Sequence, residues 1–297
     1  MEPNGPIIGL DGAKEVELCG VGRCELEVRG VLDDPLGQDI TLKSCLFDTY
    51  EDAHNVGVKV YAALQYSALE GKYGLSLSKH NQTGCLTNNG LCEFNKFFQL
   101  KEDIPVCNDY YGLMVYEKPD LRFFCSSCTV ANHKPYLVFI DNLNESLRRV
   151  KTTNEKICVS YDLYSGSRFE SGVSRFLLLI ASVEALIQQE QRPVEEIEII
   201  DDILCKIPFN HSSIRSCVSK LKSESIRSSY TRFIGNAVIL GVVSNIKAVK
   251  DFDEAYNLRS SIMHDGLMNS FSEMLNYTEK VEGIVVEILK SKILGGL

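Results

Sequence analysis

The chain has 297 residues, 44% hydrophobic and 24% charged, which is the composition of a soluble globular protein with one large or two ordinary domains. No apolar run reaches the roughly 18 residues of a membrane-spanning helix. The opening MEPNGPIIGLDG lacks the basic segment and apolar core of a secretory signal. We therefore expect a cytoplasmic protein with no membrane partner. The formal net charge of −9 disfavours broad, sequence-blind binding to nucleic acid, because that binding depends on neutralising phosphates.

The first half of the chain is dominated by short β-branched or aromatic runs separated by turn residues, a pattern typical of strands. One stretch, 52–74, favours a helix through its segment AALQYSALEG. Many strands with few helices indicate an antiparallel sandwich or barrel with one helix. The expected strands are 16–32, 39–47, 73–79, 94–100, 111–116, 121–127, 136–141 and 156–164.

After SGSRFESG the hydrophobic period becomes that of helices. Pro193 is suited to open one helix, and Gly266 to end another. The predicted fold class is α+β with two domains: a β-rich domain over 1–166 and an all-α bundle of about five helices over 167–297. The expected helices are 173–191, 193–207, 212–243 as one broken helix or two, 247–264 and 270–294.

The segment RSSIMHDG carries Arg259 and His264, five residues apart. On a regular helix this spacing separates them by roughly 140° around the axis. Both reach one substrate only if the helix ends or distorts near His264, or if the site lies at a subunit contact. On spacing alone, the favoured explanation of the segment is a solvated Arg259 and a His264 that suits the dipole of a helix C-terminus.

A basic strip, 212–233, holds five cations against the single acid Glu224. It is compatible with RNA contact, for which Arg227 and Arg232 are the candidate residues, and equally with a solvated helix face. The five cations are Arg215, Lys220, Lys222, Arg227 and Arg232.

Three segments in order, RFLLLIASVEALI, SESIRSSYTRFI and AYNLRSSIMHDG, together resemble the Apea-like branch of the HEPN superfamily over about 168–295. In that branch the first helix carries a glutamate, here Glu184. A later helix carries an aromatic residue followed by an Arg-x4-His motif. The counterparts here are Tyr256, Arg259, Ser260, His264 and Asp265–Gly266.

The resemblance implies a metal-independent endoribonuclease that forms a homodimer through the HEPN bundle, so that two Arg-x4-His motifs share a cleft. His264 would draw the proton from the ribose 2′-OH, a role that histidine as a residue type suits, and Arg259 would stabilise the phosphate charge. Ser260, Glu184 and Tyr256 would support the pair, and we expect Glu184 to orient Arg259. The family suggests a bacterial toxin or antiphage effector, with 1–166 sensing or recruiting a protein trigger or regulator.

The alternative function is a catalytically inactive HEPN module for dimerisation or RNA binding. Ser260 stands where active members often carry Asn, Asp or His, and this difference and the acidic charge favour the alternative. The Arg259–His264 pair favours the enzyme.

The 11 cysteines cannot all pair within one chain, and a reducing cytoplasm would keep most as thiols. Those in KICVSY and DILCKI have the apolar surroundings of small buried residues. Cys125 and Cys128 have zinc-knuckle spacing, with His133 or the pair Cys85 and Cys92 as further ligands. Only one CxxC is present, so packed thiols are favoured over zinc. We expect no metal and no cofactor, because phosphate-binding glycine loops, HExxH and GxSxG are absent.

Overall fold

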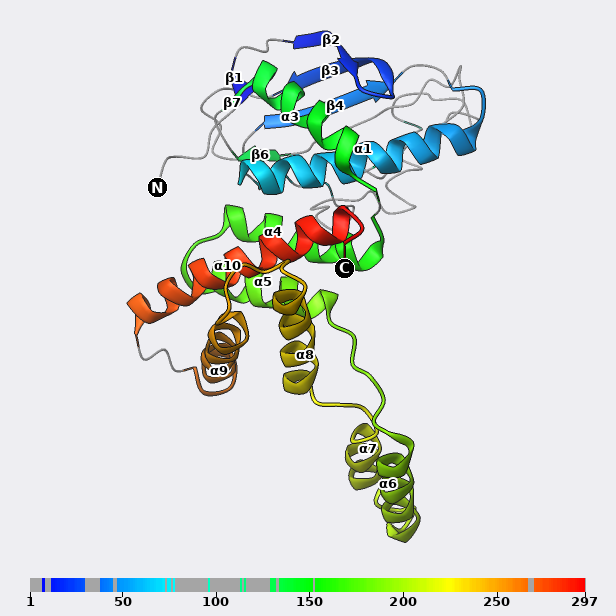
Figure 1. The fold of residues 1–297 in the computed structure, drawn as a ribbon, viewed down its shortest axis with the longest axis vertical. Coiled ribbons are helices and arrows are strands. Elements are labelled where there is room, and N and C mark those ends of the chain that lie inside the picture. The colour runs from blue at the N-terminus through cyan, green and yellow to red at the C-terminus, as the bar shows by residue number, and fades with distance from the viewer. Residues whose placement is uncertain are drawn as a thin grey trace. The chain divides into compact units, whose positions relative to one another are not determined.

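The structure is a computed structural model, and the described chain is mostly helical with an antiparallel sheet near the N-terminus (Figure 1). This two-part α+β layout agrees with the predicted fold class. The expected strands 94–100, 111–116 and 121–127 lie largely outside the described residues. The described residues are 7–8, 12–29, 38–44, 47–72, 74–75, 77, 96, 113, 115, 129–131, 134–151, 153–266 and 270–296.

The sheet has the strand order β2-β3-β4-β6-β5, and all of its pairings are antiparallel. Along β3, Cys24 and Leu26 are buried while Arg23 and Glu25 are exposed, so one face of the sheet is covered. β1 (Ile7–Ile8) and β7 (Lys134–Pro135) form a separate parallel pair. The strands of the sheet are β2 (Gly12–Leu18), β3 (Gly22–Arg29), β4 (Gln38–Ser44), β5 (Gly74–Leu75) and β6 (Thr129–Ala131).

Helices pack beside this sheet where a sandwich or barrel was expected. α1 (Tyr50–Gly71) confirms the predicted helix, and the Thr49 hydroxyl caps it by accepting a hydrogen bond from the Asp52 N–H at 3.0 Å. α1 contacts α3 (Tyr136–Arg149), which in turn contacts β2. The Asn144 side chain joins α3 to the end of β2, since its Oδ1 accepts from the Cys19 N–H at 2.7 Å.

Two of the expected strands are helices. The run 136–141 opens α3, and 156–164 lies within α4 (Glu155–Phe169). Both have aromatic and β-branched residues, but their buried positions recur with the helical period of three or four. In α3 these are Phe139, Ile140, Leu143, Ser146 and Leu147, and in α4 they are Ile157, Ser160, Tyr161, Tyr164, Ser165 and Ser167.

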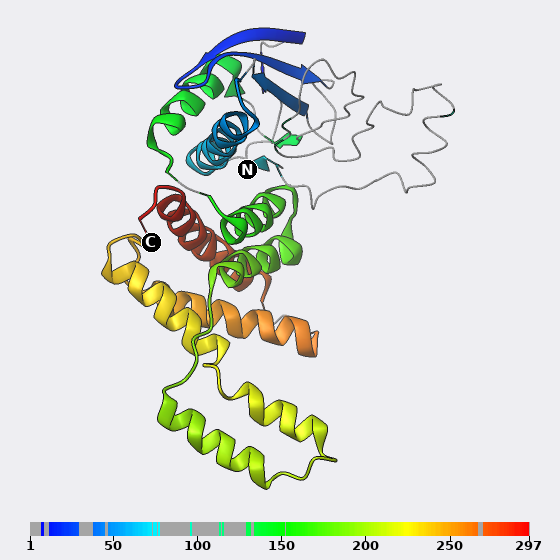
Figure 2. The same cartoon turned by 90° about the vertical axis from the view of Figure 1, so that its right-hand side faces the viewer.

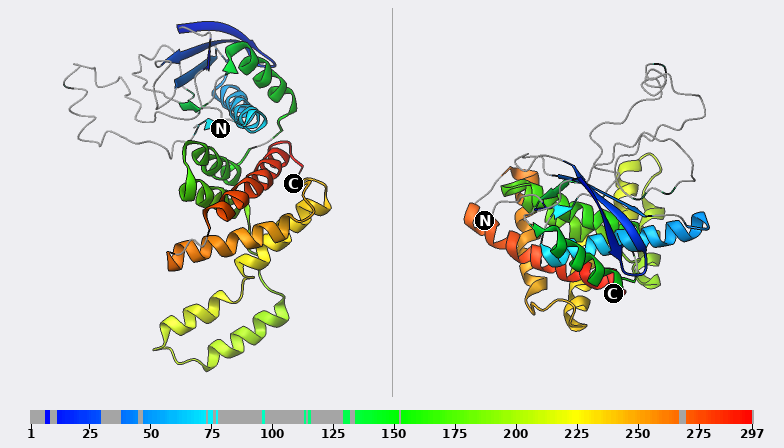
Figure 3. Two further views of the ribbon diagram at one scale, coloured as in Figure 1. Left: turned by 90° about the vertical axis from the view of Figure 1, so that its left-hand side faces the viewer. Right: turned by 90° about the horizontal axis from the view of Figure 1, so that it is seen from above.

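The predicted C-terminal helices are present, as six elements instead of about five. The stretch 212–243 forms two helices, because Ser225 caps the second with a hydrogen bond from the Ser228 N–H at 3.1 Å. The helices are α5 (Gly172–Leu186), α6 (Val194–Lys206), α7 (Ser212–Lys220), α8 (Ile226–Ile239), α9 (Ala248–Asp265) and α10 (Phe271–Ile293). α8 and α9 lie side by side (Figures 2 and 3).

The chain divides into two compact units, Met1–Ser182 with Leu289–Leu297, and Val183–Ile288. The domain boundary near residue 166 stays a prediction, and that residue lies within α4. Aromatic residues are prominent in both cores, with Tyr66, Tyr161 and Phe176 in the first and Tyr230 and Phe252 in the second. No helix in the described part of the chain is both long enough and apolar enough to cross a membrane.

Candidate functional site

Helix α9 carries Tyr256, Arg259, Ser260 and His264, and it continues through His264 to Asp265. Gly266 ends it in the left-handed conformation, φ 65°, with its N–H donating to the Ser261 carbonyl. The helix therefore does not end between the two candidate catalytic residues. Their side chains leave α9 about 140° apart around its axis.

Arg259 is held from two sides. Its Nη2 lies 3.6 Å from Oε2 of Glu184 on α5, and its guanidinium lies over the Tyr256 ring at 5.5 Å from the centroid. The side chains of Arg259 and Glu184 are only 29% and 24% exposed, so solvent screens this pair less than a surface pair. The structure thus places the Glu184 carboxylate beside Arg259.

Tyr256 connects this pair to the aromatic core of the second unit. Its ring contacts Tyr230 at 5.1 Å and Phe252 at 6.4 Å between centroids. Burial raises the pKa of Tyr256, and the Glu184 carboxylate raises it further through its charge and a hydrogen bond. Tyr256 therefore stays protonated.

His264 lies apart from this cluster. It is exposed in the last turn of α9, and its side chain makes no hydrogen bond or ion pair with another described residue. An imidazole there can accept a proton from a bound molecule. Ser260, next to Arg259, is half-exposed.

Arg227, one of the two predicted RNA contacts, forms an ion pair with Asp253 of α9. Asp253 also accepts a hydrogen bond from the Tyr230 hydroxyl at 2.5 Å. Burial raises the pKa of Asp253, but the hydrogen bonds from Tyr230 and Arg227 outweigh it and lower that pKa overall. The Arg227 side chain is 60% exposed, so it still faces solvent.

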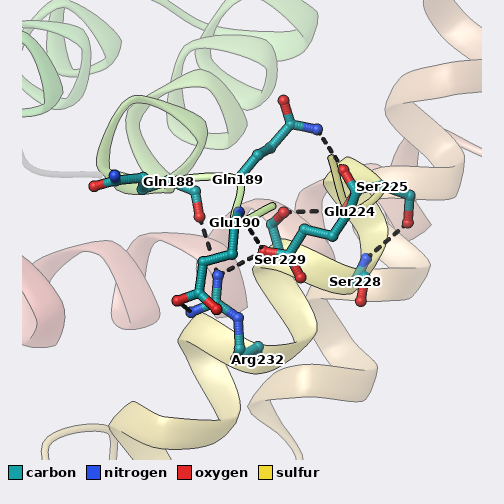
Figure 4. A network of polar contacts seen from close by, with 8 residues as sticks. All are labelled: Gln188, Gln189, Glu190, Glu224, Ser225, Ser228, Ser229 and Arg232. Carbon is teal, nitrogen blue, oxygen red and sulfur yellow. Dashed lines mark hydrogen bonds and ion pairs between the residues drawn. The ribbon is translucent and has the colours of Figure 1, made fainter. Parts of the chain in front are cut away.

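Arg232, the other predicted RNA contact, joins the two chain segments that flank the α6–α7 hairpin (Figure 4). Its guanidinium contacts Glu190 at 2.7 Å and Glu224 at 2.5 Å, and it donates to the Gln188 carbonyl at 3.1 Å. The hydrogen bond from Arg232, with one from the Glu190 N–H, lowers the pKa of Glu224 to about 2. Arg232 therefore links the two segments in the folded protein. RNA contact by Arg227 or Arg232 stays a prediction.

Sequence reasoning missed Tyr230 and Asp253. They stand 23 residues apart on α8 and α9, so no helical spacing relates them, and only the packing of the two helices brings them together. The structure gathers Glu184, Arg259 and Tyr256 with this pair and does not bring His264 to them.

The structure also describes some of the cysteines. Cys158 is half-buried and Cys205 is exposed, so the expectation of a small buried residue is wrong for Cys205. Within the described ranges, no three His, Cys, Asp or Glu side chains are grouped so as to hold a metal ion. The proposed zinc ligands Cys85, Cys92, Cys125, Cys128 and His133 lie outside those ranges. The described free thiols are Cys19, Cys24, Cys158, Cys205 and Cys217.

Comparisons of the chain with protein-family models, curated proteins and solved structures give no match.

Proposed function

We propose that the helical C-terminal part of the chain is a metal-independent endoribonuclease of HEPN type that uses Arg259 and His264. The observation that carries the proposal is the fixed position of Arg259 within RSSIMH, between Glu184 and the Tyr256 ring. An arginine held in one orientation before substrate arrives loses little freedom on binding a phosphate. Its planar guanidinium can donate two parallel hydrogen bonds to phosphate oxygens.

In the proposed reaction, His264 accepts the proton of a ribose 2′-OH, and the 2′ oxygen attacks the adjacent phosphorus. The bond from phosphorus to the 5′ oxygen breaks, and that oxygen takes up a proton. Arg259 stabilises the charge that develops on the phosphate oxygens. The products are a 2′,3′-cyclic phosphate and a 5′-hydroxyl. DNA lacks the attacking hydroxyl and is not cut.

The separation of Arg259 and His264 around α9 has a consequence for this mechanism. One copy directs the two side chains about 140° apart, so they do not meet one phosphate from the same helix face. We propose that two copies contribute to each site, with Arg259 of one copy acting beside His264 of the other. A homodimer through the helical part would supply this arrangement.

The biological role that we propose is that of a cytoplasmic bacterial toxin or antiphage effector. The N-terminal part would sense a trigger, recruit a partner or restrain the nuclease. The family resemblance alone supports this role.

The decisive experiment incubates the purified protein with end-labelled RNA and a DNA of the same sequence, both in EDTA. We expect cleavage of RNA alone, with cyclic phosphate ends, and loss of cleavage in Arg259→Ala and in His264→Ala. Mixing these two variants tests the shared site, because a mixed dimer retains one complete Arg259–His264 pair. Cleavage that persists in both variants, or that needs added metal, overturns the mechanism.

A second candidate function is an inactive HEPN module that binds RNA or dimerises. The ion pair between Arg259 and Glu184 favours this second function, because the Glu184 carboxylate already neutralises the positive charge of Arg259 that would bind a phosphate. RNA binding without cleavage in the same assay, unchanged in His264→Ala, identifies this function.

A further inference from the structure

The α6–α7 hairpin is a separate feature of the second unit. The hairpin begins after Gln191 and ends before Ser223, and these two residues form an antiparallel bridge. At the same place the Arg192 N–H donates to the Lys222 carbonyl at 2.8 Å. The ribbon views show α6 and α7 side by side and set away from α8 and α9 (Figures 1 and 2).

The hairpin leaves much of its apolar surface exposed. Among its described residues Ile200 of α6 is buried, and α7 has no buried residue. Two helices that shield so little from water do not form a core of their own, and a large exposed apolar patch is typical of an interaction site. The exposed large apolar side chains are Val194, Ile199, Ile203, Phe209, Ile214 and Leu221.

Four of these side chains lie on one face of the hairpin. Ile199 and Ile203 follow each other at i, i+4 on α6. Ile214 of α7 and Leu221, the C-cap residue of that helix, are related by i, i+7. On each helix, these exposed side chains lie roughly 100° around the helix axis from the side that packs against the other helix. The rotation has the same sense on both helices. In two antiparallel helices, equal displacements fall on the same face. We call Ile199, Ile203, Ile214 and Leu221 the hairpin stripe.

The two edges of the hairpin carry opposite charge. α6 has five acids against Lys206, whereas α7 has Arg215 and Lys220 and no acid. Salt bridges engage Glu196 and Asp201 within the hairpin region. The remaining acids of α6 and Lys220 make no ion pair with any residue that the structure describes. The unpaired acids are Glu195, Glu198 and Asp202.

We propose that the hairpin stripe is the contact surface for a second copy of this chain. A two-fold interface places the same patch on both copies, so the patch must complement itself in charge as well as in shape. This hairpin does so when α6 of one copy lies opposite α7 of the other, since Glu195 and Asp202 then face Lys220. The reverse pairing, α6 on α6, sets acid against acid.

The charge of α6 also argues against other occupants. RNA and anionic lipid surfaces would meet the unpaired acids of α6 beside the stripe, and that contact is repulsive. Helices of this length give a face of about 20 Å by 20 Å, which is small for a permanent dimer. We therefore expect an association that depends on protein concentration.

Sedimentation velocity from about 1 to 100 µM tests the proposal on the full chain. We expect the unmodified protein to shift from monomer to dimer. Ile203→Lys and Leu221→Glu should each abolish the shift, and both change exposed side chains, so the fold is retained. The matched control is Val194→Lys, which adds the same charge to α6 outside the stripe and should leave the dimer unchanged.

Two native thiols give an independent measurement on the unmodified protein. Cys205 and Cys217 are both exposed, but Cys217 lies among the stripe residues of α7, whereas Cys205 lies on the other side of the hairpin. At high concentration we expect Cys217 to be alkylated several-fold more slowly and Cys205 to be unaffected. Mass spectrometry of the two cysteine peptides reads each rate, and Ile203→Lys should remove the protection.

The proposal does not rest on ribonuclease activity, since both measurements are made without RNA. A protein that stays monomeric with Cys217 equally reactive at all concentrations overturns it. A dimer that survives in Ile203→Lys and Leu221→Glu also overturns it, because the contact then lies elsewhere, and that outcome leaves the proposed nuclease standing.

Discussion

At the scale of single residues, the ion pair between Glu184 and Arg259 has the clearest consequence. Arg259 can be oriented in the proposed reaction only if something fixes its guanidinium, and the contacts that do so in the described structure are Glu184 and the Tyr256 ring. Glu184 touches no substrate in this scheme, so it is a positioning residue. Its contribution should therefore appear in kcat more than in KM.

We predict that Glu184→Gln lowers kcat for RNA cleavage by about tenfold or more, because a misplaced catalytic group costs rate steeply. Glu184→Asp keeps the charge, and its kcat should fall between those of the unmodified protein and of Glu184→Gln. Steady-state cleavage of a labelled RNA gives both constants, and a melting curve checks the fold. Glu279→Gln, which removes an exposed acid of α10 away from the hairpin stripe, is the matched control. Unchanged kcat and stability in Glu184→Gln would contradict the positioning role.

Glu224 provides a prediction on stability and pH. Its pKa falls from the ordinary 4.5 to about 2 in the folded protein, chiefly through the hydrogen bond from Arg232. A lowered pKa stabilises the fold above pH 4.5 and ceases to do so as the pH falls toward 2. Glu224→Gln should melt a few degrees below the unmodified protein at pH 7. Melting curves from pH 7 to pH 3 should show the two proteins converging, and a constant difference would refute this.

At the scale of secondary-structure elements, two glycines should respond oppositely to alanine. Gly266 ends α9 with φ 65°, where a side chain is strained, whereas Gly283 lies inside α10 with open space around its Cβ position. Gly266→Ala should cost about 1 kcal/mol, and Gly283→Ala should gain about 0.5–1 kcal/mol by removing helix-breaking freedom. Urea denaturation measures both. Equal effects would mean that Gly266 is not a helix cap in solution.

The elements also show why strand prediction failed where helix prediction succeeded. The runs YLVFID and KICVSYDLY have strand-like composition, and within such short windows both periods fit. The helical period becomes visible only when Leu143 and Leu147 extend the first run, or when Asn154 is read as the cap of the second. That cap is real, since Asn154 Oδ1 accepts from the Ile157 N–H at 3.0 Å.

At the scale of the whole molecule, the chemical state of the cysteines distinguishes a protein with free thiols from one that binds zinc. We predict 11 titratable thiols per chain in denaturant without reductant, and no stoichiometric zinc by elemental analysis of protein purified without chelator. The five described cysteines are free thiols. One zinc per chain, released as the denaturant exposes Cys125 and Cys128, would refute the prediction.

Much of the candidate site could be predicted from sequence because its members share one helix. Tyr256, Arg259, Ser260 and His264 follow one another within nine residues, and the helix and its Gly266 cap were both predictable from local pattern. The partners of Arg259 were harder. The family resemblance led us to expect that Glu184 orients Arg259, but whether the two side chains meet depends on how α5 and α9 pack.

The sequence by itself determined the two-part α+β layout, the C-terminal helices with most of their limits, and the segment where chemistry is most concentrated. These features depend on residues within a few turns of each other, where capping, hydrophobic period and backbone strain act locally. Only the tertiary structure decided that Asp253 holds Tyr230 and Arg227, that Arg232 is engaged by Glu190 and Glu224, and that the α6–α7 hairpin leaves its stripe uncovered. Those facts depend on distant segments meeting in space, and no local pattern contains that information.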